Sequence, residues 1–241
     1  MKIIIKEDYG EMSSGAANII ARQIMREPES VLGLPTGRTP VGTYAQLVNY
    51  YDNDLLDFAE ITTFNLDEYY NLPRDHEESF HSYMKKRLFS KVNLKDENTN
   101  IPDGEAVNPE RECQRYEESI EEAGGINLIV LGVGINGHIG FNEPGADWGS
   151  KTRLVDLAES TTRQNFERME EAPDEALTMG IRTIMHSEKV LLLASGDEKK
   201  RALEEVLRGP VDQNWPGSIL QLHPNLTVIM DKEATPEELE D

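Results

Sequence analysis

Apolar runs and amphipathic stretches alternate along the whole chain of 241 residues, and this alternation restricts the possible folds most strongly. The apolar, strand-like runs are 2–6, 30–34, 60–66, 126–133, 189–195 and 226–231. The stretches with helical periodicity are 11–26, 40–51, 78–90, 109–123, 175–186 and 197–208. Several runs are apolar on both faces, which is typical of parallel strands covered by helices on each side. The sequence therefore predicts an α/β fold with a mainly parallel sheet.

The chain shows no internal repeat, low-complexity linker or shift in composition that would mark a domain boundary. A chain of this length can bury one large core. We therefore expect a single domain over residues 1–241. The acidic segment 230–241 is expected to be a frayed or weakly helical tail.

Charge and composition exclude several classes of protein. Lys and Arg total 24 against 45 Asp and Glu, a formal charge of −21 that argues against binding nucleic acid through its phosphates. No apolar run approaches the roughly 18 residues that span a bilayer, so a soluble protein without membrane contact is expected. Cys113 is the only cysteine. An intrachain disulfide or a thiolate metal cluster is therefore impossible, and a cytoplasmic location is favoured.

In parallel sheets, ligands bind at the carboxyl ends of the strands, so the loops after the strands carry most information about function. The first such loop, "LPTGRTP" (34–40), offers a glycine, hydroxyl groups and a proline suited to the first position of a helix. Its N–H groups and the helix amino terminus could bind a phosphate. It matches neither the P-loop nor the dinucleotide pattern. An ordinary strand-to-helix turn is the alternative.

A phosphate site also needs positive charge, and few cationic residues lie in the loops that follow strands. Arg163 in "STTRQN" and Lys199 in "SGDEKK" are the candidates, and Lys199 lies at the start of a predicted helix. The alternative for each is a solvated surface charge.

The stretch "FNLDEYYNLP" (64–73) places two carboxylates directly after a buried strand. One of Asp67 and Glu68 could point into a cleft as a general base while the other points away. Alternation along the strand does not decide between them, and a helix-cap or turn aspartate is the alternative.

A glycine-rich loop, "GVGINGHIGFNEPG" (132–145), follows the fourth apolar run. Its glycines allow tight turns that would bring Asn136, His138 and Glu143 to one side. A histidine beside a carboxylate can move protons near neutral pH. One His and one Glu are too few for a zinc site, and neither a zinc-protease motif nor a serine-nucleophile elbow is present. No metal is therefore expected.

Six blocks together resemble the glucosamine-6-phosphate deaminase (glucosamine-6-phosphate isomerase) family: "LGLPTGRTP", "TFNLDEYYNL", "GVGINGHIGFNEPG", "TTRQN" with "ALTMGIRTI", "SGDEKK" and "LQLHP". They stand in the same order, from about residue 30 to 230. The resemblance implies a single three-layer α/β/α sandwich with a Rossmann-like sheet, related to ribose-5-phosphate isomerases and 6-phosphogluconolactonases. It also implies conversion of glucosamine 6-phosphate and water to fructose 6-phosphate and ammonia.

The resemblance also assigns roles to residues. Asp67 matches the base that moves a proton between C2 and C1, His138 the acid/base that opens the pyranose ring, and Glu143 the residue that supports this histidine. Many family members have Asp where this chain has Asn136, and because an amide cannot ionise, a positional role is expected there. The positions that match phosphate-binding residues are Gly37, Thr39, Arg163 and Lys199.

The implied reaction needs no metal, flavin, nicotinamide or pyridoxal, because the carbonyl of the substrate itself accepts electrons. Two enzymatic alternatives on the same fold are a 6-phosphogluconolactonase and a simple aldose–ketose phosphate isomerase. A non-catalytic sugar-phosphate sensor is a third, and release of ammonia separates all three from a deaminase. The chain is similar in length to monomeric relatives, so a monomer is favoured and a homo-oligomer stays open.

Overall fold

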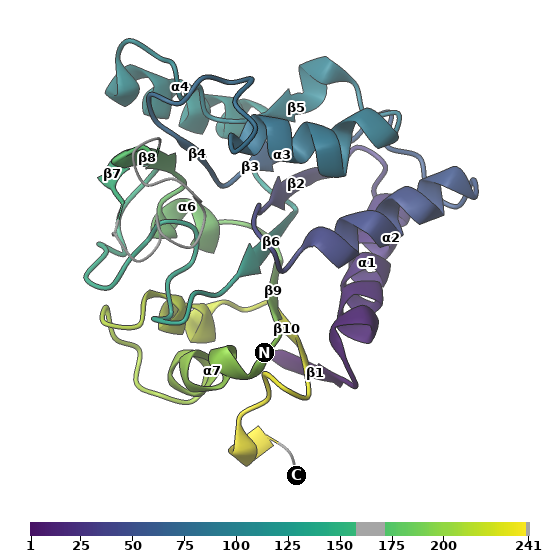
Figure 1. Ribbon diagram of the computed structural model, residues 1–241, viewed down its shortest axis with the longest axis vertical. Helices are drawn as coiled ribbons and strands as arrows, with labels where there is room; N and C mark the ends of the chain where they lie inside the picture. The colour runs from purple at the N-terminus through teal and green to yellow at the C-terminus, as the bar shows by residue number, and fades with distance from the viewer. Residues whose placement is uncertain (158–171, 240–241) are drawn as a thin grey trace.

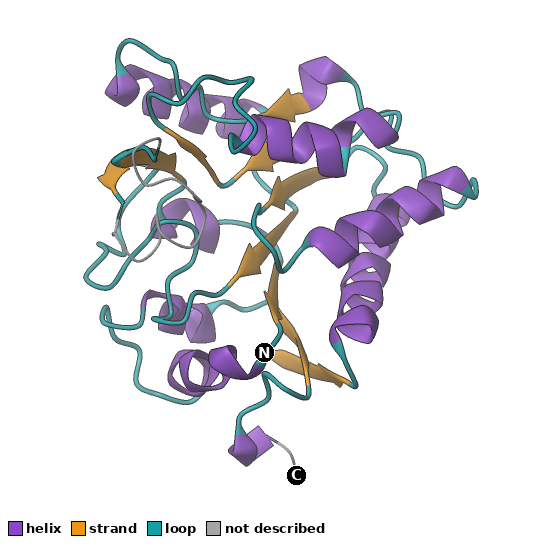
Figure 2. Cartoon of the chain, viewed as in Figure 1, coloured by secondary structure: helices purple, strands orange, loops and turns teal. Residues whose placement is uncertain are grey.

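A central sheet of seven parallel strands organises the computed structural model, which describes residues 1–157 and 172–239 (Figures 1 and 2). Its strands are β1 (Lys2–Lys6), β2 (Val31–Leu34), β3 (Thr62–Asn65), β5 (Thr99–Asn100), β6 (Leu128–Gly132), β9 (Val190–Ala194) and β10 (Leu226–Asp231). Their order across the sheet is β1-β10-β9-β6-β2-β3-β5, and every pairing is parallel. All six apolar runs contribute a strand, so the predicted parallel sheet is confirmed.

Helices cover both faces of this sheet. They are α1 (Tyr9–Arg26), α2 (Val41–Asp52), α3 (Phe80–Arg87), α4 (Pro109–Glu122), α6 (Ile181–Met185) and α7 (Lys200–Leu207). Short 3-10 helices span Phe89–Lys91, Asp96–Asn98, Asp197–Lys199, Pro216–Leu222 and Glu237–Leu239. Within residues 1–157 and 172–239, no helix has the length and apolar character needed to cross a bilayer.

Most of the core lies in two parts, one on each face of the central sheet, and a smaller third cluster contains Tyr69, Phe80 and Phe141. Alternate residues of each strand enter opposite parts: Leu191 and Leu193 of β9 pack toward α1 and α2, whereas Leu192 and Ala194 pack toward α7. In Figure 1, α1 and α2 lie to the right of the sheet and α6 and α7 to its left. These layers confirm the α/β/α sandwich.

A second sheet, which the sequence analysis did not predict, has three antiparallel strands. Its order is β4 (Asp67–Tyr69), β8 (Glu175–Thr178) and β7 (Arg153–Asp156). The helix expected over 175–186 is therefore wrong in its first half, and only Ile181–Met185 is helical. β8 is paired on both edges, and this tertiary pairing outweighs the helix-like spacing of its apolar residues.

Residues 230–236 are packed against the rest of the protein, contrary to the expected frayed segment 230–241. β10 continues to Asp231, and Ala234 and Thr235 are buried. Asp231 accepts hydrogen bonds from the N–H groups of Ala234 and Gly196, at 2.9 and 3.1 Å. A single turn of 3-10 helix, Glu237–Leu239, follows.

The direction of the chain through the sheet reverses between two neighbouring strands, β2 and β6. From β2 the chain moves outward to β3 and β5, and from β6 it moves the opposite way to β9 and β10. The loops that leave the carboxyl ends of β2 and β6 therefore diverge. Such a crevice is the usual ligand site of an open α/β sheet.

Candidate active site

A pocket of about 180 Å³ lies at this divergence. It is lined by Pro35, Thr36, Gly37, Arg38, Thr39, Leu66, Asp67, Phe80, Gly132, Val133, Gly134, His138, Gly140, Phe141 and Lys199. Of the residues expected from the sequence, Asp67, His138, Gly37, Thr39 and Lys199 all line it. Asn136 and Glu143 contact His138 or its neighbours, as described below. Arg163 lies outside the described residues.

The loop between β2 and α2 forms one wall of the pocket. Gly37 has φ +90°, in the left-handed region that favours glycine, and a Cβ there would meet no described atom within 4 Å. The loop leads directly into α2, whose amino-terminal end carries partial positive charge. This geometry can receive an anion.

Three tyrosines hold the carbonyl oxygens of this loop. The hydroxyl of Tyr83 donates to the Gly37 carbonyl at 2.6 Å, Tyr44 to Pro35 at 2.5 Å, and Tyr9 to Thr39 at 3.2 Å. Hydrogen bonding of these carbonyls reduces their repulsion of a bound phosphate. Sequence reasoning missed the tyrosines because their hydrogen bonds to the loop depend on how α1, α2 and α3 pack, which no motif indicates.

Among the described residues, two Lys or Arg side chains line the pocket. Lys199 ends the 3-10 helix after β9 and precedes α7; burial lowers its pKa, and the charge of Glu198 opposes that shift. Arg38 is the second cation; it stands within "PTGRTP" but was not among the residues expected to bind phosphate.

Asp67 begins β4 and is 6% exposed. Burial raises its pKa to about 8, and the charge of Glu68 contributes to the rise. Glu68 points away from the pocket, where its carboxylate accepts hydrogen bonds from backbone N–H groups. Alternation along the strand did not distinguish Asp67 from Glu68, but the structure does: Asp67 is the carboxylate that faces the pocket.

His138 is held by the glycine-rich loop after β6. A Cβ at Gly134 would lie 2.4 Å from the His138 ring, so only glycine leaves room for it. The Nδ1 atom of His138 lies 3.1 Å from Oε1 of Glu143. Asn136 donates from Nδ2 to Oε2 of Glu143 at 2.6 Å and accepts the His138 N–H at 3.3 Å. Asn136 therefore orients both the carboxylate and the histidine backbone, as expected of an amide here.

The pocket can perform proton transfer on a bound anion. A proton on Nδ1 of His138 would face Glu143, which leaves Nε2 to exchange a proton with a ligand. Asp67 supplies a carboxylate whose raised pKa suits a base near neutral pH. Among residues 1–157 and 172–239, no group of three or more His, Cys, Asp and Glu side chains could hold a metal ion.

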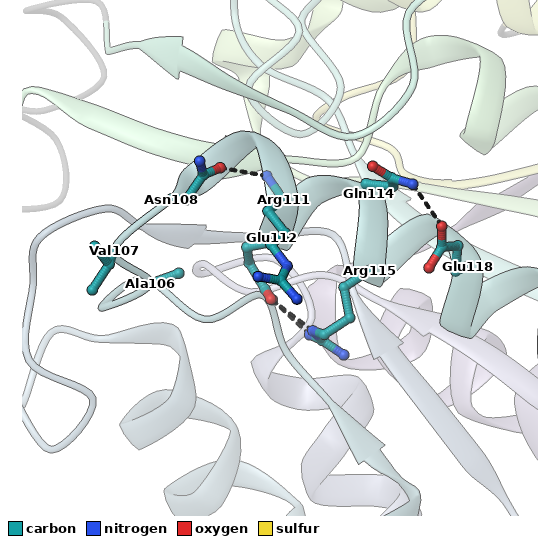
Figure 3. A pocket seen from close by; sticks show the side chains of 8 residues that line it. All are labelled: Ala106, Val107, Asn108, Arg111, Glu112, Gln114, Arg115 and Glu118. Carbon is teal, nitrogen blue, oxygen red and sulfur yellow. Dashed lines mark hydrogen bonds and ion pairs between the residues drawn. The ribbon is translucent and has the colours of Figure 1, made fainter.

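A larger hollow, about 600 Å³, follows the outer side of α4 (Figure 3). Its polar groups are engaged with one another: Arg115 contacts Glu112 at 2.6 Å, and Gln114 donates to Glu118 at 2.8 Å. It contains none of the residues expected from the sequence to act in catalysis or phosphate binding. The smaller pocket is therefore the candidate site.

Known proteins resemble this chain over almost its whole length. Residues 9–229 match the family model described as glucosamine-6-phosphate isomerases/6-phosphogluconolactonase. A glucosamine-6-phosphate deaminase of Clostridium botulinum (strain Langeland) is 49% identical over 97% of both chains. One of Halothermothrix orenii is 48% identical over 97% of this chain and 98% of the relative.

Solved structures show the same fold. A monomeric glucosamine-6-phosphate deaminase superposes with a TM-score of 0.95 at 44% identity, over 97% of this chain and 98% of that one. The 6-phosphogluconolactonase of Trypanosoma cruzi superposes with a TM-score of 0.78 at 20% identity, over 100% of this chain and 97% of the other. The second similarity concerns the fold alone.

Proposed function

The chain belongs to the glucosamine-6-phosphate isomerase and 6-phosphogluconolactonase family, and from this premise we propose how its pocket carries out the deaminase reaction. It is an enzyme of the glucosamine-6-phosphate deaminase type, which converts glucosamine 6-phosphate and water to fructose 6-phosphate and ammonia. The observation that carries the mechanism is that Asp67, His138 and the Gly37 loop line one pocket.

His138 serves the first step, ring opening. The closed sugar has no free carbonyl, so the ring oxygen must gain a proton while the C1 hydroxyl loses one. Glu143 at 3.1 Å holds the imidazole in orientation, and Asn136 holds Glu143. Ring opening exposes the C1 aldehyde, which acidifies the hydrogen on C2.

Asp67 serves the second step, proton transfer between C2 and C1. Its carboxylate removes the C2 proton and returns it to C1 through an enolamine, while the C1 oxygen gains a proton and the amino group loses one, which leaves a C1 hydroxyl and an imine at C2. Water hydrolyses the imine to the ketone and ammonia. The substrate carbonyl accepts the electrons, so this route involves no cofactor.

The phosphate fixes the sugar so that C1 and C2 face Asp67. We assign its binding to Gly37, Thr39 and Lys199, and Arg38 adds a second charge in the same pocket. Arg163, which lies outside the described residues, stays a prediction for this site. Binding energy from the phosphate, remote from the reacting carbons, serves to orient them.

The deaminase assignment is favoured over a lactonase or a simple isomerase. The relatives at 48–49% identity are deaminases, whereas the lactonase of Trypanosoma cruzi is 20% identical and shares only the fold. A sensor would need no buried base beside an acid/base histidine. We further propose a monomer, as in the structural neighbour, and a cytoplasmic location, which stays a prediction from the single cysteine.

A coupled ammonia assay tests the function directly. Purified protein is incubated with glucosamine 6-phosphate, galactosamine 6-phosphate and N-acetylglucosamine 6-phosphate, and ammonia and ketose phosphate are measured together. We expect equal amounts of ammonia and fructose 6-phosphate from glucosamine 6-phosphate. Hydrolysis of 6-phosphogluconolactone in a parallel reaction, with no ammonia released from glucosamine 6-phosphate, would instead identify a lactonase.

A further inference from the structure

Glu68 is a buried carboxylate that the proposed reaction does not use. It follows Asp67 directly on β4, is 4% exposed and borders a separate outer cavity of about 690 Å³. Its Oε1 accepts the N–H groups of Tyr69 and Phe80, each at 2.9 Å, and its Oε2 accepts that of His81, also at 2.9 Å. Phe80 and His81 are the first two residues of α3. Glu68 therefore fastens the amino-terminal end of α3 to β4.

This helix end reaches the pocket in two places. Phe80 is buried and lines the pocket beside Asp67. Tyr83, about one turn further along α3, donates its hydroxyl to the Gly37 carbonyl at 2.6 Å. The position of α3 thus sets both a wall of the pocket and a carbonyl of the loop assigned to phosphate.

We propose that Glu68 is a positioning residue of the deaminase reaction, which fixes α3, and through Tyr83 the loop 35–40, relative to the base Asp67. This inference rests on the proposed function. Because Asp67 and Glu68 are adjacent on one short strand, a single carboxylate sets the distance between the phosphate site and the reacting carbons. A shift of α3 would move the bound phosphate, and with it the reacting carbons, relative to the carboxylate of Asp67.

The charge of Glu68 supports the same role. Burial raises the pKa of Glu68 itself to about 7. Hydrogen bonds from three backbone N–H groups and the charge of Arg74 act in the opposite direction and lower this pKa. Its negative charge contributes to the raised pKa of Asp67. Glu68 therefore both places the base and keeps it strongly basic.

Other titratable or charged groups surround the pair. Those on the Asp67 side are Arg38, Tyr44, Tyr116, His138 and Lys199. Those on the Glu68 side are Arg74, His81, Asp103, Glu105, Glu112 and Arg115. The variants below leave all of them unchanged.

The main test compares the pH profile of kcat/KM for the parent with that of Glu68→Gln. The amide keeps the size of the side chain, but its nitrogen cannot accept the N–H of His81. We expect KM for glucosamine 6-phosphate to rise about fivefold or more, as for one lost hydrogen bond. The acid limb should also move to lower pH, because a neutral Gln no longer raises the pKa of Asp67. A purely structural role would not move that limb.

Two further variants separate the effect of Glu68 on the position of α3 from the effect of its charge on Asp67. Glu68→Asp keeps the charge but is too short to reach α3, so it should raise KM and leave the acid limb in place. Tyr83→Phe breaks only the bond to Gly37 and should behave in the same way. The matched control is Glu78→Gln, which removes an equal charge from an exposed site just before α3 and should match the parent.

The inference would be overturned if folded Glu68→Gln kept both the KM and the acid limb of the parent. A parental KM in Tyr83→Phe would also overturn it. If Glu68→Gln does not fold, Glu68→Asp and Tyr83→Phe decide: raised KM in both supports the proposal, and parental KM in either overturns it. Failure of the proposed function looks different, because the parent itself would then release no ammonia from glucosamine 6-phosphate.

Discussion

At the residue scale, the side chain of Asp67 occupies an energetically costly position that the proposed reaction would explain. This carboxylate is only 6% exposed and lies beside the second acid Glu68. Burial and the neighbouring charge destabilise its ionised form, so its pKa rises to about 8. Near neutral pH a base of this strength can remove a proton from carbon more readily than a solvated aspartate. The proposed reaction therefore explains the burial of this carboxylate, whereas the stability of the core does not.

Replacement of Asp67 by Asn should abolish proton transfer while keeping the shape of the side chain. We expect kcat to fall by about 10²- to 10⁴-fold with KM little changed, which is the signature of a lost transition-state interaction. In D₂O the parent should place deuterium on C1 of fructose 6-phosphate, in less than full amount if the carboxylate returns part of the original proton. Near-parental turnover of the variant would remove Asp67 from the mechanism.

The same replacement should stabilise the protein at high pH. The folded pKa of Asp67, about 8, lies above its ordinary value of 3.8. Between these values the folded state holds a proton that the unfolded state has lost, so the free energy of unfolding falls as pH rises from about 4 to about 8. Asn has no proton to lose. Asp67→Asn should therefore raise Tm by roughly 2–10 °C above pH 8 and much less near pH 4.

The control for this stability measurement is Asp75→Asn, at an exposed site. Its difference in Tm from the parent should stay flat across the same pH range. Equal pH dependence in both variants would show that burial of Asp67 is not the cause.

For His138, the expected defect is in ring opening. Gln can form hydrogen bonds but cannot titrate, so His138→Gln should slow ring opening by about 10²-fold or more and make it rate-limiting. The isotope effect of C2-deuterated substrate should then fall toward one, because cleavage of the C2–H bond no longer limits the rate. A variant as fast as the parent at every pH would contradict the assignment of His138.

The sequence selected residues that the structure brings together, but it did not predict their detailed geometry. The types and spacing in "GINGHIGFNEP" suffice to place His138, Glu143 and Asn136 together, because glycines force the turn. The choice between Asp67 and Glu68 needed the structure, since both follow the same strand. Tyr83 could not be predicted at all, because its contact with Gly37 depends on how α3 packs.

At the scale of elements, buried polar contacts connect helices and strands whose proximity the sequence pattern does not indicate. Glu117 on α4 accepts hydrogen bonds from the N–H and hydroxyl of Thr152, at 2.8 and 2.5 Å, and from the hydroxyl of Thr183 on α6, at 2.7 Å. Glu117 is 8% exposed. Its carboxylate thus connects α4, the residue before β7 and α6.

Glu117→Ala should lower the free energy of unfolding by about 2–4 kcal/mol, because it leaves several buried donors without an acceptor. Urea unfolding measures this loss. The matched control is Glu118→Ala, which removes the same group from an exposed position on α4 and should cost less than about 0.5 kcal/mol. Equal losses in the two variants would show that the network around Glu117 contributes nothing specific.

The parallel sheet was predictable because its strands are apolar on both faces, whereas the small antiparallel sheet was not. β8 carries Ala176 and Leu177, and the nearby Ile181 and Ile184 complete a spacing that also fits one face of a helix. Pairing with β4 and β7 makes this segment a strand, and β4 lies far away in the sequence. Local periodicity contains no information about them.

At the scale of the whole molecule, the proposed site has to bind an anion within a strongly acidic protein. The formal charge of −21 repels a sugar phosphate at long range, and among the described residues Lys199, Arg38 and the backbone of one loop can attract it. Salt screens the distant repulsion over about 8 Å at physiological ionic strength but affects direct contacts in the pocket less. Specific binding can therefore persist where the net field is unfavourable.

The same net charge should make thermal stability depend on salt. Repulsion among excess carboxylates destabilises the compact state, and added ions screen it. We expect Tm at pH 7.5 to rise by roughly 2–6 °C between about 20 mM and 500 mM KCl, with a similar rise in NaCl because screening is not specific to the cation. The effect should shrink as pH approaches the sequence pI of about 4.6, where the net charge vanishes. A Tm that stays flat or falls with salt at pH 7.5 would show that the excess carboxylates are already compensated within the folded protein.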